Sequence, residues 1–165
     1  MELEQSPIFI CGHPKAGTSL LTSLLDGHPA MVVYPEETLF FRRFLPAVEG
    51  KSVDERLALA DDLLIHFFQW NQENPPEHQQ DYPDRDYSNI DFDQVHHFLS
   101  YSIRQRGDCD KAYLEGAVMA FGMATGLLTE ATRYCVEQTH YNEFYSDQIF
   151  DWWPDAKCVH VIRDP

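Results

Sequence analysis

An α/β fold, with a parallel sheet flanked by helices in a three-layer α/β/α arrangement, is predicted by the order of the segments along this sequence. Short apolar runs rich in Ile, Val and Phe alternate with longer stretches in which apolar residues recur every three or four positions. The short runs are typical of buried parallel strands, and the longer stretches are typical of the helices that cover them. A chain of 165 residues with 44% hydrophobic residues fits a single globular domain.

The first half of the chain supplies two predicted strands and three predicted helices. β-branched and aromatic residues indicate strands over residues 8–11 and 31–34. A helix over 18–26 ends at Gly27 and carries an apolar stripe that consists of Leu20, Leu21, Leu24 and Leu25. Two further helices are predicted, one starting near 35–37 and carrying Leu39, Phe40, Phe41 and Phe44, and one over 53–70.

In the second half, a stretch rich in Pro, Asp, Gln and Glu over residues 71–89 predicts a surface loop or lid. Helical periodicity resumes over 91–106, where Asp91 is suited to be the N-cap. The next helix, over 111–129, contains glycines that permit close packing, namely Gly116, Gly122 and Gly126. The pattern ends with predicted strands over 133–137 and 157–162, joined by a helix over 142–153.

The excess of acidic over basic residues in this chain argues against some classes of binding partner. The formal net charge is −15 at pH 7, so the mean field repels nucleic acids and polyanionic glycans, and we expect no nucleic-acid partner. Neither a signal peptide nor an apolar run of about eighteen residues is visible, so we expect no membrane partner and a cytoplasmic location. The cysteine spacing indicates small buried hydrophobic residues rather than a disulfide or metal framework; the cysteines are Cys11, Cys109, Cys135 and Cys158.

The segment from Pro7 to Leu21 has the layout of a strand, an anion-binding loop and a helix. A helix that begins near Thr18 presents unpaired backbone N–H groups and the positive end of its dipole to the loop. Lys15 adds a point charge, and glycines at positions 12 and 17 let the backbone approach a ligand closely. This segment therefore predicts a phosphate site. The order of Lys15 and Gly17 disfavours a Walker A loop, and the dinucleotide pattern GxGxxG is absent.

The loop Pro14-Lys15-Ala16-Gly17-Thr18-Ser19 resembles the 5′-phosphosulfate loop of sulfotransferases that use 3′-phosphoadenosine 5′-phosphosulfate (PAPS). A second stretch, Glu137-Gln138-Thr139-His140, resembles the Glu-Lys-Thr-Pro turn of that family, and the last predicted strand ends in the family's Arg-Asp-Pro as Arg163-Asp164-Pro165. On these motifs the chain is identified as a member of this family, similar to its carbohydrate, tyrosylprotein and bacterial members. The resemblance implies the P-loop-like nucleotide-binding fold of sulfotransferases.

The resemblance also implies the co-substrate and its ligands. PAPS would be held by residues Lys15, Ala16, Gly17, Thr18 and Ser19 of the loop and by Arg163, which would bind the 3′-phosphate. Lys15 would in addition stabilise the charge that builds on the bridging oxygen during transfer. We expect no metal ion. The acceptor would be a hydroxyl or amine of a carbohydrate, a peptide tyrosine or a small metabolite.

A carboxylate base is implied by the same resemblance. In carbohydrate and tyrosylprotein sulfotransferases a glutamate follows the His-Pro that ends the first helix, and here His28-Pro29 is followed by Glu36 and Glu37. The pattern Glu-x-x-Phe-Phe favours Glu37, which Phe40 and Phe41 would partly desolvate. A simpler interpretation of the glutamate pair is an acidic helix N-terminus. Cytosolic sulfotransferases use a histidine base instead, which leaves two alternatives, His13 and His140.

This sequence departs from the family pattern on the acceptor side, where we place Glu36, Gln138, Thr139 and His140. Gln138 stands where the family has lysine, and His140 stands where it has proline, so one cation is absent. Either His140 supplies part of that charge or the acceptor differs. Three tryptophans are candidates for stacking on an acceptor, although large aromatic residues are more often core; they are Trp70, Trp152 and Trp153.

We interpret residues 1–165 as a single sulfotransferase domain that lacks its C-terminal part, because family members continue past the Arg-Asp-Pro strand. Two other interpretations remain open at this point. One is a non-catalytic nucleotide-binding module or inactive fragment, suggested by Gln138, and the other is a P-loop kinase with magnesium-dependent ATP binding, which the position of Lys15 disfavours. The sequence discloses neither the acceptor nor the oligomeric state.

Overall fold

A computed structural model of the chain describes residues 6–66 and 90–163. Its centre is a sheet of four strands, all paired in parallel, in the order β2-β3-β1-β4. The strands are β1 (Ser6–Gly12), β2 (Met31–Val33), β3 (Tyr134–Gln138) and β4 (Lys157–Val161). This confirms the predicted α/β class and the four predicted strands, with ends that differ by one or two residues.

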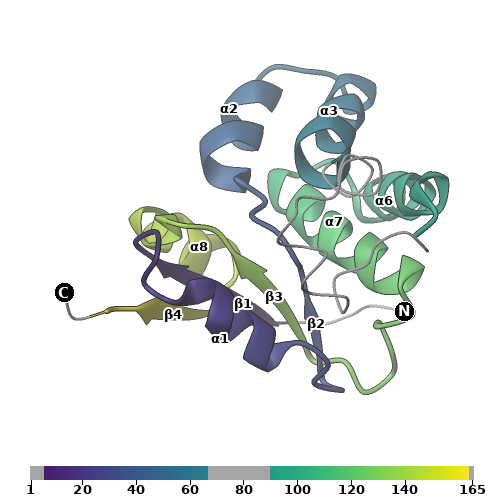
Figure 1. The fold of residues 1–165 in the computed structure, drawn as a ribbon. Coiled ribbons are helices and arrows are strands. Elements are labelled where there is room, and N and C mark those ends of the chain that lie inside the picture. Colours follow the sequence, from purple (N-terminus) through teal and green to yellow (C-terminus); the bar gives the residue numbers. More distant parts are fainter. Residues whose placement is uncertain (1–5, 67–89, 164–165) are drawn as a thin grey trace.

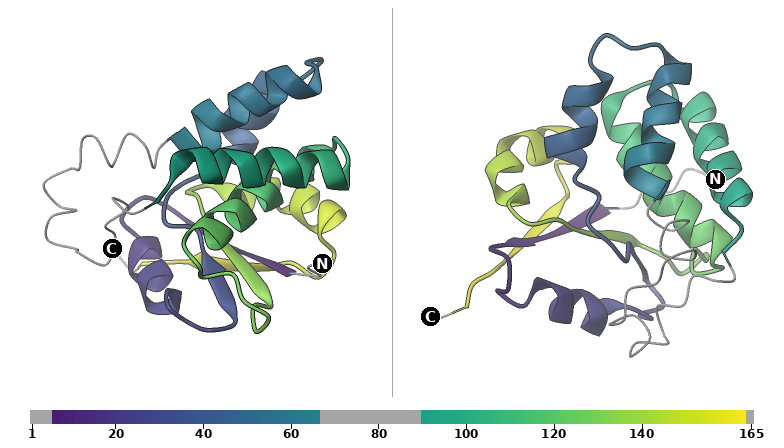
Figure 2. Two further views of the ribbon diagram at one scale, coloured as in Figure 1. Left: turned by 90° about the vertical axis from the view of Figure 1, so that its right-hand side faces the viewer. Right: turned by 45° about the horizontal axis from the view of Figure 1, so that its top comes forward.

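Helices cover both faces of this sheet and make three layers (Figure 1). On one face lies α1 (Thr18–Leu25), and the larger helices lie on the other face, as the tilted view of Figure 2 shows. The larger layer contains α2 (Leu45–Val48), α3 (Val53–Ala60), α6 (Phe92–Arg106), α7 (Asp110–Ala124) and α8 (Ser146–Trp152), together with the short turns η1 (Phe40–Phe44), η2 (Asp61–Ile65) and η4 (Asn142–Tyr145).

The alternation of residues along β1 divides the core into two parts. Ile8 and Ile10 pack with Val33 and Val136 in a small cluster beneath α1, whereas Phe9 joins the large cluster beneath α7 and α8. The large cluster combines aliphatic and aromatic side chains, and the rings of Phe9 and Trp153 lie 5.5 Å apart between centroids. Successive side chains of a strand point to opposite faces, so one strand serves both layers.

The predicted apolar stripe of the first helix is only half buried. Leu21 and Leu25 pack against the small cluster, but Leu20 and Leu24 are 67% and 72% exposed. Thr18 and Thr22 are buried instead, and the Thr22 hydroxyl donates to the Thr18 carbonyl at 2.9 Å. The preceding loop fixes the rotation of α1, because Thr18 at its start packs against the end of β1.

The helix predicted to begin near residues 35–37 begins later, at Phe40, where η1 starts and runs into α2. Residues 35–38 form a loop, and Leu39 has a left-handed backbone (φ 51°). The cause is Thr38, whose hydroxyl accepts from the Phe40 N–H at 3.2 Å while donating to the buried Glu137 carboxylate. That pairing holds residue 38 out of the helix and caps the turn that follows.

Other predicted boundaries are largely confirmed. Asp91 accepts a hydrogen bond from the Gln94 N–H and caps α6 as expected. The helix predicted over 111–129 starts at Asp110 and ends at Ala124, because Gly126 adopts a left-handed turn (φ 72°). The helix predicted over 142–153 consists of η4 followed by α8. The helix predicted over 53–70 appears as α3 and η2, and its last residues and the loop or lid predicted over 71–89 lie outside the described residues.

The cysteines fit the predicted buried, unpaired state only in part. Cys11 is 1% exposed, and Cys135 and Cys158 are half-buried, but Cys109 is exposed because it precedes α7 at the protein surface. Within residues 6–66 and 90–163, no helix is long and apolar enough to cross a membrane.

Two glycines of α7 explain how this helix approaches its neighbours. A Cβ built on Gly122 would lie 2.9 Å from a methyl carbon of Val32 in β2, whereas one built on Gly116 would lie 3.0 Å from the terminal methyl of Leu99 in α6. Val32 is a β-branched residue in a buried strand and has little freedom to move. The methyl of Leu99 is the far end of a flexible side chain. The predicted close packing is therefore confirmed at these two glycines and wrong at Gly126, where nothing lies within 4 Å of a built Cβ.

We predict that Gly122→Ala lowers the free energy of unfolding by about 1–3 kcal/mol, because the added methyl group overpacks the contact with Val32. Gly116→Ala is the matched control in the same helix. Its strain is relieved by movement of Leu99 and offset by the better helix propensity of alanine, so the change should stay within about 1 kcal/mol. Urea unfolding measures both variants, and equal losses would contradict this explanation.

Candidate active site

The loop between β1 and α1 is shaped for a ligand at the carboxyl edge of the sheet. Gly12 ends β1 with a φ of 145°, and a Cβ there would lie 2.6 Å from the Val161 carbonyl oxygen, so the position has no room for a side chain. Lys15 has a left-handed backbone (φ 69°), and Gly17, the N-cap of α1, has a φ of 108°. The loop thus takes a tight path that directs the start of α1 toward the sheet edge.

The start of α1 has the properties of an anion site. No side chain caps the helix, and its first turn contains no acidic residue, so its N–H groups and positive dipole end are not neutralised locally. Lys15 and Ser19 are exposed beside it, Ala16 is half-buried and Thr18 is buried. All five predicted loop residues are therefore gathered around one helix N-terminus.

Arg163 is brought to the same loop from the far end of the sequence. It follows β4, which pairs with β1 so that Gly12 lies opposite Val161. Its Nη1 donates to the Lys15 carbonyl oxygen at 3.5 Å, and its side chain is exposed. The two cations that sequence analysis assigned to the two ends of one co-substrate, Lys15 and Arg163, therefore belong to adjacent strand ends.

A carboxylate–imidazole pair lies next to this loop. His140 Nδ1 is hydrogen-bonded to Glu37 Oε1, and His140 Nε2 lies 3.4 Å from the Thr18 hydroxyl oxygen. The side chains of His140 and Glu37 are 17% and 31% exposed. Because Nδ1–H donates to the carboxylate, a neutral ring leaves Nε2 unprotonated and facing the start of α1. The predicted base and one of its two alternatives thus form a single unit.

Glu137 is a buried carboxylate beneath this pair. It lies near the end of β3 at 2% exposure, and its Oε1 accepts from the Thr38 hydroxyl at 2.7 Å and from the Thr139 hydroxyl. Its Oε2 accepts from the Asn142 side-chain amide at 2.7 Å. Burial raises the pKa of Glu137 from 4.5 to about 7, against the opposing effect of the hydrogen bonds from Thr139 and Thr38.

Residues with strained backbone conformations lie around the same site. Among the described residues, three that are not glycine have a positive φ: Lys15, Leu39 and Tyr141. Each lies in a different loop, after β1, after β2 and after β3 respectively. Left-handed conformations of such residues cost free energy and persist only where surrounding contacts hold them. The three loops at the carboxyl edge are therefore held in a defined shape.

The residues predicted for the acceptor side have different environments. Glu36 is half-buried, and Thr139 is 1% exposed with its hydroxyl bonded inside the protein to Glu137. Gln138 is 7% exposed, and its Nε2 has no hydrogen-bond partner in the part of the chain that the structure describes. The family's lysine position thus holds a buried amide with an unsatisfied donor, which is a costly arrangement without a ligand or water.

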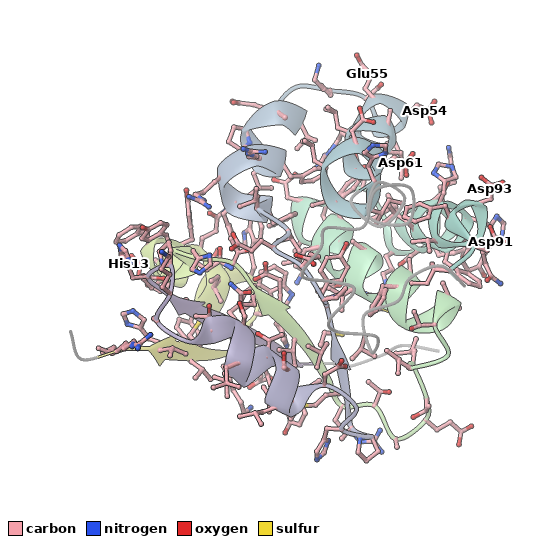
Figure 3. All side chains as sticks on the ribbon, in the orientation of Figure 1. His13, Asp54, Glu55, Asp61, Asp91 and Asp93 are labelled. Atoms are coloured by element: carbon pink, nitrogen blue, oxygen red, sulfur yellow. The ribbon has the colours of Figure 1, made fainter. Side chains whose placement is uncertain are left out.

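His13, the other alternative base, is exposed, and its Nδ1 lies 3.0 Å from the Pro14 carbonyl oxygen. Its ring meets Tyr141 edge-on with centroids 5.7 Å apart, so it forms part of the rim of the site. Figure 3 shows His13 at the loop that follows β1, whereas the labelled acidic residues, Asp54, Glu55, Asp61, Asp91 and Asp93, lie on the helical layer. The acidic charge in these positions is held away from the anion loop.

The two tryptophans among the described residues belong to the core. Trp153 is 6% exposed and packs in the large core, and Trp152 is half-buried against the same cluster. This confirms the interpretation of these two residues as core. Trp70 lies outside the described residues.

The family model of sulfotransferases matches residues 7–165, which is nearly the whole chain. The chain belongs to the sulfotransferase family. Neither the search of curated proteins nor the search of solved structures found a match. The four-stranded parallel sheet and the loop after β1 of this sulfotransferase are the scaffold that its family membership implies.

Sequence analysis of this sulfotransferase missed the part that Glu137 and Thr38 play in building the site. Glu137 stands within the second motif, but no role was assigned to it. The available signal was a glutamate at the end of an apolar strand, followed by a threonine and an asparagine within five residues. A buried carboxylate needs hydrogen-bond donors, and such short polar side chains are the donors nearest to it in sequence.

We predict a pH dependence of stability that comes from Glu137. Its pKa is about 7 in the fold against 4.5 ordinarily, so its contribution to stability is fully present below about pH 4.5 and is lost as the pH rises through about 7. The loss amounts to roughly 3 kcal/mol. In Glu137→Gln this group cannot ionise, so the fall in unfolding free energy between about pH 5 and about pH 8 should be smaller than in the wild type. Urea unfolding at the two pH values measures the difference, and an unchanged fall would contradict the prediction.

Proposed function

We propose that this protein transfers the sulfuryl group of PAPS to a hydroxyl or amine of a carbohydrate, a peptide tyrosine or a small metabolite. The main observation behind the proposal is that three sets of groups lie together at one edge of the sheet. These are the uncapped start of α1 with Lys15, the strand-end cation Arg163 and the Glu37–His140 pair. Ligands of open α/β sheets bind at the carboxyl ends of the strands, where all three lie.

The loop residues supply binding and charge stabilisation in this proposal. Backbone N–H groups at Gly17, Thr18 and Ser19 would hold the 5′-phosphosulfate, because they lie at the uncapped N-terminus of α1. Lys15 would stabilise the negative charge that develops on the bridging oxygen as the sulfuryl group leaves, which is a task suited to a compact ammonium group. Arg163 would hold the 3′-phosphate through its planar guanidinium group.

The Glu37–His140 pair supplies the proton acceptor. Glu37 Oε1 is bonded to His140 Nδ1, and the acceptor proton passes to Glu37 as the new O–S or N–S bond forms. His140 stabilises the Glu37 carboxylate through this bond and, at Nε2, faces Thr18 beside the sulfuryl site. Only a protonated His140 would also supply part of the charge of the family's lysine, a position that holds Gln138 here.

The proposal predicts selective binding of 3′-phosphoadenosine 5′-phosphate. The binding should not require magnesium and should exceed the binding of ADP, because Arg163 reads the 3′-phosphate. Lys15→Ala and Arg163→Ala should each weaken binding at least about tenfold, which corresponds to one charge-assisted contact. Isothermal calorimetry measures the affinities, with Lys51→Ala, an exposed lysine in the turn between α2 and α3, as the control. Equal affinity for both nucleotides would contradict the assignment of Arg163.

The proposal also predicts how the base responds to substitution. Glu37→Gln should lower kcat at least about a hundredfold while leaving nucleotide binding intact, because general-base catalysis contributes about 10²–10⁴-fold. His140→Asn should lower kcat less, since it removes only the partner of the base. A radiolabelled-sulfate transfer assay over a panel of carbohydrate, tyrosine and phenol acceptors measures both. A larger loss in His140→Asn than in Glu37→Gln would assign the base to His140.

A second candidate function, a non-catalytic nucleotide-binding module, is favoured by one observation. Gln138 replaces the lysine of the family motif and leaves an unsatisfied amide among the described residues of the site. Such a module would bind the nucleotide without transfer, and Glu37→Gln would then change nothing measurable.

A further inference from the structure

Glu137 joins the two loops that carry the Glu37–His140 pair. Thr38, which directly follows Glu37, and Thr139, which directly precedes His140, both donate their hydroxyls to the same oxygen of Glu137. A shift of either threonine therefore moves one member of the pair relative to the other. The contact between Glu37 and His140 spans more than a hundred residues of sequence, and Glu137 is the buried group that both sides share.

Two further contacts tighten this junction. The Leu39 N–H donates to the Thr139 hydroxyl oxygen at 3.3 Å, so the loops also bond directly to each other. The Asn142 amide donates to the second oxygen of Glu137 and ties the start of η4 to the junction. The left-handed residues Leu39 and Tyr141 lie next to these contacts, which is where strain needs support.

Glu137 cannot act on substrate directly. It is 2% exposed, and both its oxygens are bonded within the protein. Glu137 also lines a small, mostly apolar cavity whose other lining residues include Phe9, Trp153, Arg106 and Glu115. A carboxylate in such a place costs free energy, and a set of well-placed donors is what makes the cost tolerable. A costly buried group that touches both site loops indicates a role exerted through them.

We propose that Glu137 is a positioning residue: by accepting hydrogen bonds from Thr38, Thr139 and Asn142, it sets the relative placement of Glu37 and His140. The kinetic part of this inference rests on the proposed function, whereas the structural part concerns only the Glu37–His140 contact. The two parts are separated by measuring the contact itself as well as turnover.

The hydrogen-bond pattern allows a rescue experiment. Asn142→Asp replaces a donor by a second acceptor and places two carboxyl groups against each other, 2.7 Å apart in the present geometry. The measurements are made above the raised pKa of Glu137, where both groups are ionised and repel, so the junction should open. Glu137→Gln combined with Asn142→Asp restores a donor and an acceptor in exchanged positions. The amide nitrogen introduced at position 137 then donates to the new carboxylate, and the amide oxygen at that position still accepts from both threonine hydroxyls.

The first readout is the His140 ring, which long-range proton–nitrogen NMR follows without any substrate. Wild type should show the tautomer protonated at Nδ1, held by Glu37. Asn142→Asp should show a mixture of tautomers, and the double variant should return to the wild-type tautomer. Nucleotide binding and thermal unfolding are recorded for each variant, so that only folded protein is compared.

The second readout is turnover at saturating substrate, well below the unfolding temperature of every variant. Asn142→Asp should lower kcat about tenfold to a hundredfold with little change in the KM for PAPS, because a displaced base slows the chemical step without weakening the binding of the co-substrate. The double variant should recover most of the loss, as expected for two residues that interact directly.

Threonine variants keep the test decisive where a charged variant fails to fold. Thr38→Val removes one donor to Glu137 without changing the shape of the side chain, and Thr132→Val is its matched control. Thr132 is also buried, and its hydroxyl oxygen accepts from the Thr129 N–H at 2.9 Å, away from the site. Thr38→Val should change the His140 tautomer and lower kcat, and Thr132→Val should change neither.

The inference is overturned if folded Asn142→Asp and Thr38→Val keep the wild-type tautomer, or if the double variant shows no recovery. Failure of the proposed function has a different pattern: the tautomer responds as expected, but the wild type transfers no sulfuryl group from PAPS to any acceptor in the panel.

Discussion

Parallel pairing of β1 with both β3 and β4 is the constraint on which the rest of this structure depends. It aligns three strands so that their carboxyl ends, and the loops that follow them, meet at one edge of the sheet. Lys15, His140 and Arg163 are separated by up to 148 residues, yet each follows one of these strands. β2 pairs with β3 in the same sense and adds the loop that carries Glu37.

Burial of polar groups at this edge is the second constraint. Thr38, Glu137, Thr139 and Asn142 are each no more than 2% exposed, and they satisfy one another through hydrogen bonds. Water cannot replace a lost partner at such depth, so these contacts are strongly cooperative. The same contacts explain why the segment before η1 is a loop and why Leu39 and Tyr141 keep strained backbones. One network of hydrogen bonds therefore determines both the local fold at this edge and the arrangement of the site.

Most strands and helices could be predicted from local sequence patterns, because the spacing of apolar residues and the residue types at helix ends indicate where they form. The strand around Ile10 and the helix capped by Asp91 are examples. The rotation of α1 about its own axis could not be predicted in this way. The apolar pattern predicted a buried stripe of four leucines, whereas contacts with the loop bury Thr18 and Thr22 instead. The start of η1 was also misplaced, since the hydrogen bond that displaces it joins Thr38 to a residue 99 positions away.

The sequence by itself determined the class of fold, the sulfotransferase resemblance and the identity of the loop, base and strand-end candidates, because motifs keep chemically required residues at short spacing. Only the tertiary structure decided that Glu37 and His140 form one pair, that Arg163 reaches the Lys15 loop and that Glu137 joins the site loops. Those contacts connect segments that are far apart in the chain. Their geometry is fixed by strand register and side-chain burial, neither of which is encoded in a short stretch of sequence.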